Sequence, residues 1–519
     1  MAEGSTPLDN GALYIASGKI VAVQKKNAPA PTGFGSAPRL ETHGTIFPGL
    51  IELHNHLAYN ILPQWAVPKT YGDRSQWQNV ADYHRLVTTP MGTLGKKPEL
   101  LPAICRYVEC KALFGGATTS QGIRLVSAAG IGRYFRGLVR NVEAPVDAAF
   151  PAASSLIADP DAKDPRAFWK TLQAKAKKGG AYLLHLSEGL DEAARKHFLA
   201  LHLADGTWAI NSALAGIHSA ALHASDFKTM KSRGGSMVWS PLSNMLLYGD
   251  TADMAAAKAS GIRIGLGPDW SPSGSKNLLG ELKVAHLYSQ AHENLFSPEE
   301  LGVMATRTAA QILGWDKVVG TLEAGKYADF VVAAISSADP WPGLIQMKEL
   351  DVQLVGIGGV PRFGHPDLMS ALSADGEHVT VGGKWRVLYA TDTDPEVPTL
   401  SFAQASAMLA QSLKSLPGLV NGTDAPLARA LARFRPTGPQ WTLALDELGL
   451  TEEDLRPHLP LGGQPTGPEP RRALAPKAVP PVSIALDPPT VADDTGFLSL
   501  IKKQMNLPDY VKTGLPGLY

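Results

Sequence analysis

The chain has 519 residues, 44% of them hydrophobic, and its 48 Lys and Arg residues equal its 48 Asp and Glu residues in number. A single hydrophobic core rarely grows beyond about 250–300 residues, so the length predicts two or three structural parts. The balanced charge excludes a broad basic surface for nucleic acid, and the hydrophobic content excludes disorder of the whole chain.

The cysteine content and the hydropathy pattern bear on the compartment. Cys105 and Cys110 are the two cysteines, and they lie in a stretch with a helical pattern. At that spacing they point to different helix faces and cannot build a disulfide framework, which fits a reducing compartment. The sequence has neither an apolar run of about 18 residues nor a basic segment followed by an apolar one near its start. We therefore expect a cytoplasmic protein without a membrane partner.

Residues 1–47 have the pattern of short β-strands. Two β-prone runs between residues 12 and 23 flank the Ser17-Gly18 turn and predict a hairpin, and another strand is predicted around Ile46 and Phe47. These strands form the first part of a predicted β domain. The dipeptide Pro48-Gly49 ends the segment.

Short apolar runs alternate with amphipathic stretches between residues 48 and 317, which predicts parallel βα units. The apolar runs are at residues 49–53, 117–120, 181–186, 214–217, 236–239 and 262–267. The length of this region matches a (β/α)8 TIM-type barrel of about 250 residues. A doubly wound open sheet is the alternative, but it would want a glycine-rich phosphate loop after an early strand, which Pro48-Gly49-Leu50 is not.

Short strands separated by glycine turns return over residues 318–390. They are predicted at residues 319–322, 330–333, 351–357, 379–381 and 385–389. Because the N-terminal strands need partners, we expect one small β-sandwich domain built from both flanking segments.

Residues 391–519 are expected to form a Pro-rich C-terminal extension. Residues 402–416 and 427–434 have helical patterns, whereas the prolines between residues 457 and 489 exclude regular helix or interior strand. The proline-rich part predicts an extended arm on the surface or a linker. Apolar residues near the end, among them Phe497, Ile501, Met505 and Leu507, predict that the last segment docks on the rest of the protein.

Metal-ligand residue types stand at the ends of four predicted strands. The first run ends in His54-Asn55-His56, and side chains at i and i+2 of a strand point to the same side. Three later runs end in His185, His218 and Asp269. One strand-end histidine is usually structural, but these positions meet at the carboxyl ends of a parallel barrel, where active sites lie. Imidazoles and a carboxylate suit zinc or a similar divalent ion.

Several segments resemble motifs of the amidohydrolase superfamily, over roughly residues 10–390 of the chain. Its members are metal-dependent hydrolases with a (β/α)8 barrel and a β-sandwich made from both ends of the chain. The similar segments are PGLIELHNH (48–56), GGATT (115–119), SPLSN (240–244), GPD (267–269) and GTLEAGKYADFV (320–331). The proline in GPD departs from the family pattern.

The resemblance also implies a branch of the superfamily. Residues 140–152 contain no lysine, whereas many two-metal members carry a carboxylated lysine on strand 4. Glu188 follows His185 by three residues, and this HxxE pattern is typical of the mononuclear aminohydrolase and chlorohydrolase-like members. The resemblance implies one divalent ion, Zn²⁺ in the first place with Fe²⁺ or Mn²⁺ as alternatives, held by His54, His56, His185 and Asp269. His218 is either a further ligand or a hydrogen-bonding group beside the metal-bound water.

These assignments make chemical sense. A bound divalent ion lowers the pKa of water from 15.7 towards about 7, so that hydroxide forms near neutral pH. Glu188 would act as the proton shuttle, a role worth typically about 10²–10⁴-fold in rate. Asp269 would accept the proton of the water, and His218 would donate a hydrogen bond to the developing oxyanion.

Residues in the loop after His56 are weaker candidates for substrate contacts, with ordinary loop packing as the alternative. They are Tyr59, Gln64, Trp65, Tyr71, Arg74 and Trp77. His43 and His286 lie before and after the barrel strands and are not favoured as ligands.

The sequence therefore predicts a metal-dependent hydrolase of a non-peptide carbon–nitrogen bond in a small molecule. The main prediction for the reaction is deamination of an amino-heterocycle, or hydrolysis of a cyclic amide or amidine. The alternatives are displacement of a halide from a heteroaromatic ring and a non-catalytic barrel that serves as an interaction protein. No nucleic-acid partner is expected, and a homodimer or larger homo-oligomer is expected by analogy only.

Overall fold

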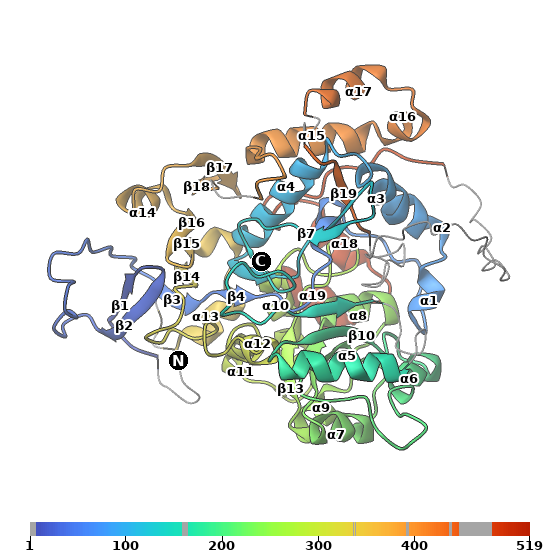
Figure 1. The fold of residues 1–519 in the computed structure, drawn as a ribbon, viewed down its shortest axis with the longest axis horizontal. Helices are drawn as coiled ribbons and strands as arrows, with labels where there is room; N and C mark the ends of the chain where they lie inside the picture. The colour runs from blue at the N-terminus through green and yellow to red at the C-terminus, as the bar shows by residue number, and fades with distance from the viewer. Residues whose placement is uncertain are drawn as a thin grey trace.

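The computed structural model describes residues 7–157, 165–335, 337, 339–390, 394–434, 438–445 and 480–519. Figure 1 shows an α/β arrangement, with antiparallel strands on one side, parallel strands and their helices in the middle, and the helices α15, α16 and α17 at the top. Within the described residues, no helix is both long enough and apolar enough to cross a membrane.

Eight parallel strands form two sheets, of three and of five strands. The smaller sheet has the order β4 (Leu50–Ile51), β5 (Ala117–Ser120), β8 (Arg140–Asn141). The larger sheet runs in chain order through β9 (Ser154–Leu156), β10 (Tyr182–Leu186), β11 (Leu214–His218), β12 (Ser236–Trp239) and β13 (Arg263–Leu266). The apolar runs of the sequence thus correspond to parallel strands.

Backbone hydrogen bonds connect the two parallel sheets at both of their edges. On one edge, Leu53 N donates to Leu266 O at 3.3 Å. On the other, Ala153 N donates to Val142 O at 2.7 Å. Side chains from both sheets, such as Ile51 of β4 and Ile217 of β11, also pack in one hydrophobic cluster with Trp315. The two sheets therefore enclose a common core.

Helices lie between and after the parallel strands (Figure 1). They are α4 (Leu101–Phe114), α5 (Pro165–Lys177), α6 (Glu192–Leu199), α7 (Ala224–Ser232), α8 (Pro241–Tyr248), α9 (Met254–Ser260), α10 (Leu278–Ala291), α11 (Pro298–Met304) and α12 (Arg307–Leu313). Every residue of α4 is buried, including both cysteines and the charged residues Arg106, Glu109 and Lys111. The segment between β4 and α4 holds η1 (Leu57–Ile61), α1 (Arg74–Trp77), α2 (Ala81–Tyr83), η2 (His84–Thr88) and α3 (Thr89–Leu94).

A six-stranded antiparallel sheet combines both flanks of the chain, in the order β17-β18-β16-β15-β14-β3. Its strands are β3 (Thr45–Pro48), β14 (Phe330–Ala333), β15 (Val352–Ile357), β16 (Val360–Gly364), β17 (Glu377–Val381) and β18 (Lys384–Leu388). The hairpin of β1 (Gly11–Ala16) and β2 (Lys19–Lys25) packs on this sheet through Ile20. The α13 (Pro340–Gln346), η4 (Glu349–Asp351) and α14 (Pro366–Ala371) segments connect the strands.

The strand predicted at residues 319–322 is wrong. This segment forms bends instead, because Gly320 has a φ of +89°, outside the β region, and Val319 N donates back to Trp315 O. The other strands predicted in the C-terminal flank are present, and β3 pairs with β14 as a discontinuous domain requires. The two-layered sandwich itself stays a prediction.

The described part of the C-terminal extension packs against the remainder of the protein. Its elements are α15 (Phe402–Lys414), α16 (Leu416–Asn421), α17 (Ala425–Ala432), β19 (Trp441–Leu443), α18 (Phe497–Lys503) and α19 (Asp509–Gly517). β19 joins a small sheet with β6 (Arg124–Ser127) and β7 (Gly132–Tyr134). The ring of Phe402 stacks on Tyr107 of α4, with centroids 5.4 Å apart.

The expected proline-rich arm lies only partly in the described residues. Residues 480–489 form no helix or strand, as predicted, whereas residues 457–479 lie outside the described part. The expectation of an extended arm on the surface or a linker does not hold at Asp487, which is 1% exposed. The end docks as predicted through Ile501 and Leu507, but Met505 is 71% exposed and takes no part.

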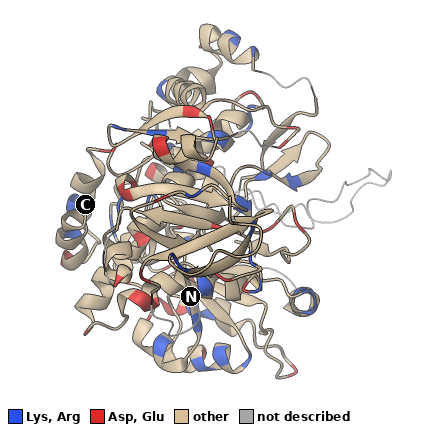
Figure 2. Cartoon of the chain, turned by 90° about the vertical axis from the view of Figure 1, so that its left-hand side faces the viewer, with Lys and Arg blue, Asp and Glu red and all other residues tan. Residues whose placement is uncertain are grey.

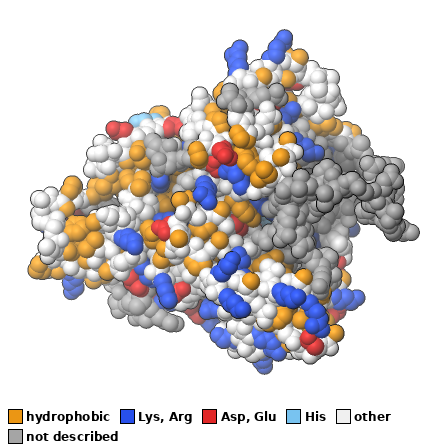
Figure 3. Space-filling model, viewed as in Figure 1, with side chains coloured by type: hydrophobic (Ala, Val, Ile, Leu, Met, Phe, Trp, Pro, Cys, Tyr) orange, Lys and Arg blue, Asp and Glu red, His pale blue; other side chains and the backbone are white. Residues whose placement is uncertain are grey.

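The positions of basic and acidic residues are distributed over the cartoon rather than segregated (Figure 2), and the face in Figure 3 shows charged side chains interspersed with apolar ones. This distribution agrees with the neutral composition.

Candidate metal centre

The structure brings together all five residues that the sequence marks as candidate metal ligands. His54 and His56 follow β4, His185 and His218 lie in β10 and β11, and Asp269 follows β13. They form two overlapping groups that share His54, and within each group the ligand atoms lie within 4.8 Å of one another. The groups are His54, His185, His218 and His54, His56, Asp269.

Distances inside this cluster fit a shared cation better than direct hydrogen bonds. His54 Nε2 lies 2.9 Å from Asp269 Oδ1, yet this buried nitrogen has no hydrogen-bond partner among the described residues. His56 Nε2 lies 3.2 Å from His185 Nε2 and 3.5 Å from Asp269 Oδ1. Within each group the ligand atoms thus lie close enough to bind one divalent ion together.

Two amide side chains fix the orientation of His54 and His218. Gln121 Oε1 accepts a hydrogen bond from the backbone N–H of Asn55 and lies 2.9 Å from Nδ1 of His54. Because this oxygen is an acceptor, His54 carries its proton on Nδ1 and leaves the lone pair of Nε2 for a metal. Asn244 Oδ1 holds Nδ1 of His218 in the same way at 2.9 Å.

The sequence analysis did not assign roles to Gln121 and Asn244. Gln121 comes directly after β5, and Asn244 lies in α8 within the SPLSN segment. A polar residue just past a buried strand end was the signal that could have identified Gln121.

The surroundings favour the neutral forms of His54 and His185 and the ionised form of Asp269. Burial lowers the pKa of His54 and holds the pKa of His185 well below its usual range. Burial alone would raise the pKa of Asp269, but the neighbouring His54, His218 and His56 outweigh burial and hold that pKa well below its ordinary value. Neutral imidazoles and an ionised carboxylate are the donor set that zinc prefers.

Backbone strain is concentrated at the ligand positions. His218 and Asp269 have φ angles of +64° and +66°, and Ser187 and Ser219 beside them also have positive φ. Left-handed conformations are costly for residues with a side chain and persist only where the surrounding structure holds them, which is common at functional sites. Here they turn the ends of β11 and β13 so that both ligands reach the cluster.

Glu188 lies beside the cluster at the end of β10. Its Oε2 is 3.8 Å from His218 Nε2 and 3.4 Å from Nη1 of Arg74, and its Oε1 accepts a hydrogen bond of 2.8 Å from the hydroxyl of Tyr248. Arg74 also donates its backbone N–H to the Glu188 carbonyl. The carboxylate is thus held in one orientation, next to a candidate metal ligand, as the HxxE pattern predicts.

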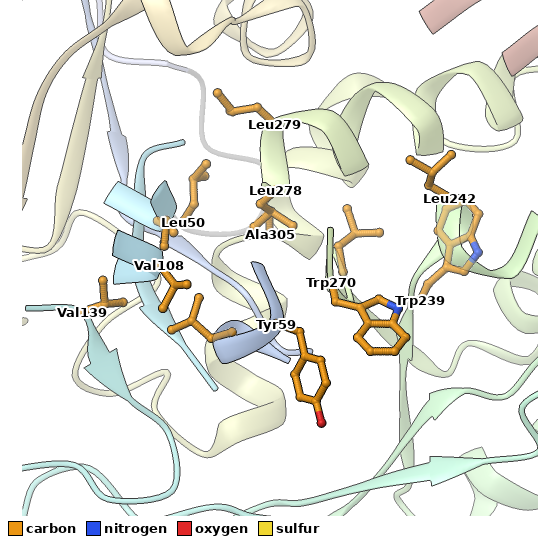
Figure 4. Packing of buried hydrophobic residues seen from close by; sticks show 14 of the residues in the cluster. Leu50, Tyr59, Val108, Val139, Trp239, Leu242, Trp270, Leu278, Leu279 and Ala305 are labelled. Carbon is orange, nitrogen blue, oxygen red and sulfur yellow. The ribbon is translucent and has the colours of Figure 1, made fainter. Parts of the chain in front are cut away.

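Buried aromatic side chains lie beside His56 of the cluster. Tyr59 and Trp270 lie near His56, with ring centroids 6.2 and 5.4 Å from its ring, and they pack against each other (Figure 4). Trp65, Tyr71, Tyr83 and Trp77 extend this group of rings. The sequence predicted Tyr59, Trp65, Tyr71 and Trp77 here but not Tyr83 or Trp270. Gln64 instead approaches the carbonyl of Gly274, at 3.5 Å.

A parallel-stranded α/β fold with histidines and an aspartate gathered at its strand ends is typical of enzymes that bind a divalent metal ion. A model of the amidohydrolase family matches residues 169–360. The chain is similar to a 5-methylthioadenosine/S-adenosylhomocysteine deaminase of Desulforudis audaxviator, at 23% identity over 62% of this chain and 80% of that protein. It also resembles an S-triazine hydrolase of Gordonia rubripertincta, at 26% identity over 32% of this chain and 36% of that protein. The match over residues 169–360 and the similarity to these relatives support the amidohydrolase superfamily and a hydrolase that acts on carbon–nitrogen bonds.

Solved structures agree on the fold. A zinc-bound adenosine deaminase from Xanthomonas campestris has a TM-score of 0.54 at 17% identity, over 79% of this chain and 94% of that one. A zinc complex of atrazine chlorohydrolase from Arthrobacter aurescens has a TM-score of 0.52 at 21% identity, over 68% and 90%. At these identities the two structures bear on the fold alone.

Proposed function

We propose that this protein is a mononuclear zinc-dependent aminohydrolase that removes an amino group from a heteroaromatic ring. The single observation that carries the proposal is the position of Glu188, which lies beside five converging candidate ligands with its carboxylate held by Arg74 and Tyr248. Relatives named as deaminases of methylthioadenosine and deoxyadenosine support this substrate class. The reaction is hydrolysis of a non-peptide carbon–nitrogen bond.

We also infer that the two parallel sheets close into one (β/α)8 barrel, which would be the scaffold for this function. The hydrogen bonds from Leu53 to Leu266 and from Ala153 to Val142, together with the bridge between Asn55 and Asp269, support joining the two parallel sheets edge to edge. In such a barrel the ligands lie at the carboxyl ends of the strands, around one entrance.

His54, His56, His185 and Asp269 would hold the ion, and His218 would complete the set. When bound, the ion lowers the pKa of a coordinated water from 15.7 towards about 7. Around it, Glu188 carries a proton to the ring nitrogen or to the departing amine. Because the Nδ1 proton of His218 is directed at Asn244 Oδ1, its Nε2, which faces Glu188, offers a lone pair and would serve as a ligand of the ion rather than as a hydrogen-bond donor.

The aromatic residues fit a flat substrate. Tyr59 and Trp270 present ring surfaces next to His56, and offset stacking of a heteroaromatic ring against such surfaces is favourable. Their burial also excludes bulk water from the reaction, which strengthens the electrostatic contacts of Glu188. We therefore expect purine-like or triazine-like rings to be favoured over aliphatic amides.

An ammonia-release assay with the zinc-loaded full chain tests the proposal. The panel holds amino-purines, amino-triazines and cyclic amides, with chloro-triazines assayed in parallel for chloride release. Ammonia release that requires zinc and Glu188 supports the proposal. Chloride release alone would favour the alternative in which a halide is displaced. The similarity to an S-triazine hydrolase supports that alternative. A protein that binds no divalent metal and turns over none of the panel would refute both.

A further inference from the structure

The segment 480–519 lies against the loops that carry the candidate ligands, although no motif in it resembles the family. In Figure 1 its helices α18 and α19 lie near the centre of the molecule, and α19 packs on α10. Asp487, which precedes both helices, is buried, and its backbone N–H donates to the carbonyl of Ile61 at 3.0 Å. Ile61 belongs to η1, directly after His56.

Asp487 pairs with two buried lysines. Its Oδ2 accepts a hydrogen bond from Nζ of Lys111 in α4, and its Oδ1 accepts one from Nζ of Lys276 at 2.5 Å. Lys276 also pairs with Asp494 at 2.8 Å, whereas Asp487 is the carboxylate paired with Lys111. A buried ammonium without a counter-charge is strongly unfavourable, so Asp487 is needed to keep Lys111 charged in this position.

Lys111 connects this ion pair to the candidate site. Its ammonium also donates to the carbonyl of Asn60 at 2.9 Å and to the hydroxyl of Ser271 at 2.7 Å. An ammonium has three N–H donors, so these two bonds and the one to Asp487 use them all. Asn60 follows His56 by four residues and Ser271 follows Asp269 by two. The lysine therefore ties the loop after β4 to the loop after β13.

Asn60 carries the connection to the ligands themselves. Its side-chain Oδ1 accepts from the backbone N–H of Ser271 at 2.8 Å, and its Nδ2 donates to Oδ1 of Asn55 at 2.9 Å. Asn55 lies between His54 and His56 and forms a parallel bridge with Asp269. A continuous set of buried hydrogen bonds thus runs from Asp487 to the residue flanked by two ligands.

A second attachment holds the aromatic part of the same loop. The side chain of Gln504 donates from Nε2 to the carbonyl of Trp65 at 2.8 Å and accepts from the backbone N–H of Val67 at 3.2 Å. Asn506 donates to the carbonyl of Lys69 at 2.9 Å. The C-terminal segment therefore makes hydrogen bonds to both halves of the loop that follows His56.

We propose that the C-terminal segment is part of the active-site scaffold, and that Asp487 is a positioning residue that acts through Lys111 and Asn60 on the metal-binding loop. This inference rests on the proposed function, because it assigns the segment to the same metal centre. Loss of the carboxylate releases Lys111 from Asn60 and Ser271, and the ligands around Asn55 then lose their fixed arrangement. Residues that orient metal ligands typically change metal affinity by roughly 10–100-fold.

The test compares Asp487→Asn with Asp494→Asn in the full chain. Both substitutions remove a carboxylate from Lys276, but only Asp487→Asn removes one from Lys111. Zinc affinity is measured by competition with a chromophoric chelator, and kcat and KM are measured on the best compound of the ammonia-release panel. We expect Asp487→Asn to weaken zinc binding at least about tenfold, and Asp494→Asn to change it less than about threefold.

A double variant separates positioning from general stability. Asp487→Asn combined with Lys111→Met leaves no uncompensated charge on α4, so the urea midpoint should recover relative to Asp487→Asn alone. Zinc affinity should stay weak, because the ammonium that joins the Asn60 carbonyl to the Ser271 hydroxyl is then absent. If zinc affinity recovers together with the urea midpoint, Asp487 is merely structural and the inference is wrong.

The remaining outcomes are also decisive. A loss of zinc affinity below tenfold in Asp487→Asn, or an equal loss in Asp494→Asn, overturns the inference while leaving the proposed function intact. If Asp487→Asn does not fold, Ser271→Ala replaces it, with a loss of about threefold or more supporting the inference and a smaller loss overturning it. Wild-type protein that binds no zinc overturns the proposed function and this inference with it.

Discussion

His54 Nε2 lies 2.9 Å from Asp269 Oδ1, although β4 and β13 are the first and last strands of the parallel set. The backbones meet at the same place, because His56 N donates to Asp269 O and Asp269 N donates to His54 O. The candidate metal centre is therefore built on the joint between the two parallel sheets.

Substitution of a ligand should abolish metal binding. His54→Ala and Asp269→Ala each delete one of the ligand atoms that converge within 4.8 Å, and we expect zinc affinity to fall by more than roughly 100-fold, beyond the loss typical for an orienting residue. Zinc content after dialysis, measured by elemental analysis, should drop from one per chain to near zero. His43→Ala changes an exposed histidine outside the cluster and should keep full zinc content. Stoichiometric zinc in His54→Ala would contradict the assigned centre.

Much of this centre could be predicted from the sequence, because the residues at the ends of strands can be identified from the local pattern of apolar residues. The runs before His54, His185 and His218 are apolar and short, so their ends could be located without knowing how the strands pair. Parallel pairing then forces these ends to the same edge, as the register of β10 with β11 shows.

Other parts depend on contacts that no local pattern records. Gln121 orients His54 only because β5 lies next to β4, and Asp487 reaches Lys111 from a segment far along the chain. The failed strand at residues 319–322 shows the opposite case, in which a β-prone composition gives way to the turn at Gly320 and to packing of Val319 under Trp315. Long-range hydrogen bonds and burial decide these features.

Glu188→Gln should remove proton transfer without removing the metal. The amide keeps the shape of the side chain and an acceptor for the Tyr248 hydroxyl, but it cannot carry a proton, so we expect kcat to fall by about 10²–10⁴-fold. Zinc content should stay at the wild-type value. Glu192→Gln, on the exposed start of α6, is the matched control and should leave kcat unchanged. An unchanged kcat in Glu188→Gln would rule out the shuttle role.

Gln121→Ala should weaken zinc binding while every ligand stays in place. The substitution frees Nδ1 of His54 and the backbone N–H of Asn55, which both point at Oε1 of Gln121, so the ring of His54 loses its fixed orientation. We expect zinc affinity to fall by roughly 10–100-fold in a chelator competition. Gln311→Ala, at an exposed position of α12, should bind zinc as the wild type does. Wild-type affinity in Gln121→Ala would mean that packing alone orients His54.

The stability of the metal-free protein should fall as the pH rises towards 8, partly because of Glu281 in α10. Burial raises the pKa of Glu281 from 4.5 to about 8, and its oxygens accept hydrogen bonds from Leu242 N and from Ser275 Oγ. Between these two pKa values the folded chain holds a proton that the unfolded chain has released. Raising the pH therefore lowers the free energy of unfolding, by at most about 1.4 kcal/mol per pH unit for one group.

Glu281→Gln should reduce this pH dependence, because the amide does not titrate. Urea unfolding at pH 6 and pH 8, in the presence of a chelator, should show a larger loss for the wild type than for Glu281→Gln, by up to about 2.7 kcal/mol over the two units. The buried Glu109 and Glu143, whose pKa values burial raises to about 7, stay in both proteins and cancel in the comparison. Glu192→Gln is exposed and should respond to pH as the wild type does. Equal losses in the wild type and Glu281→Gln would show that Glu281 is already ionised in the folded chain at pH 6.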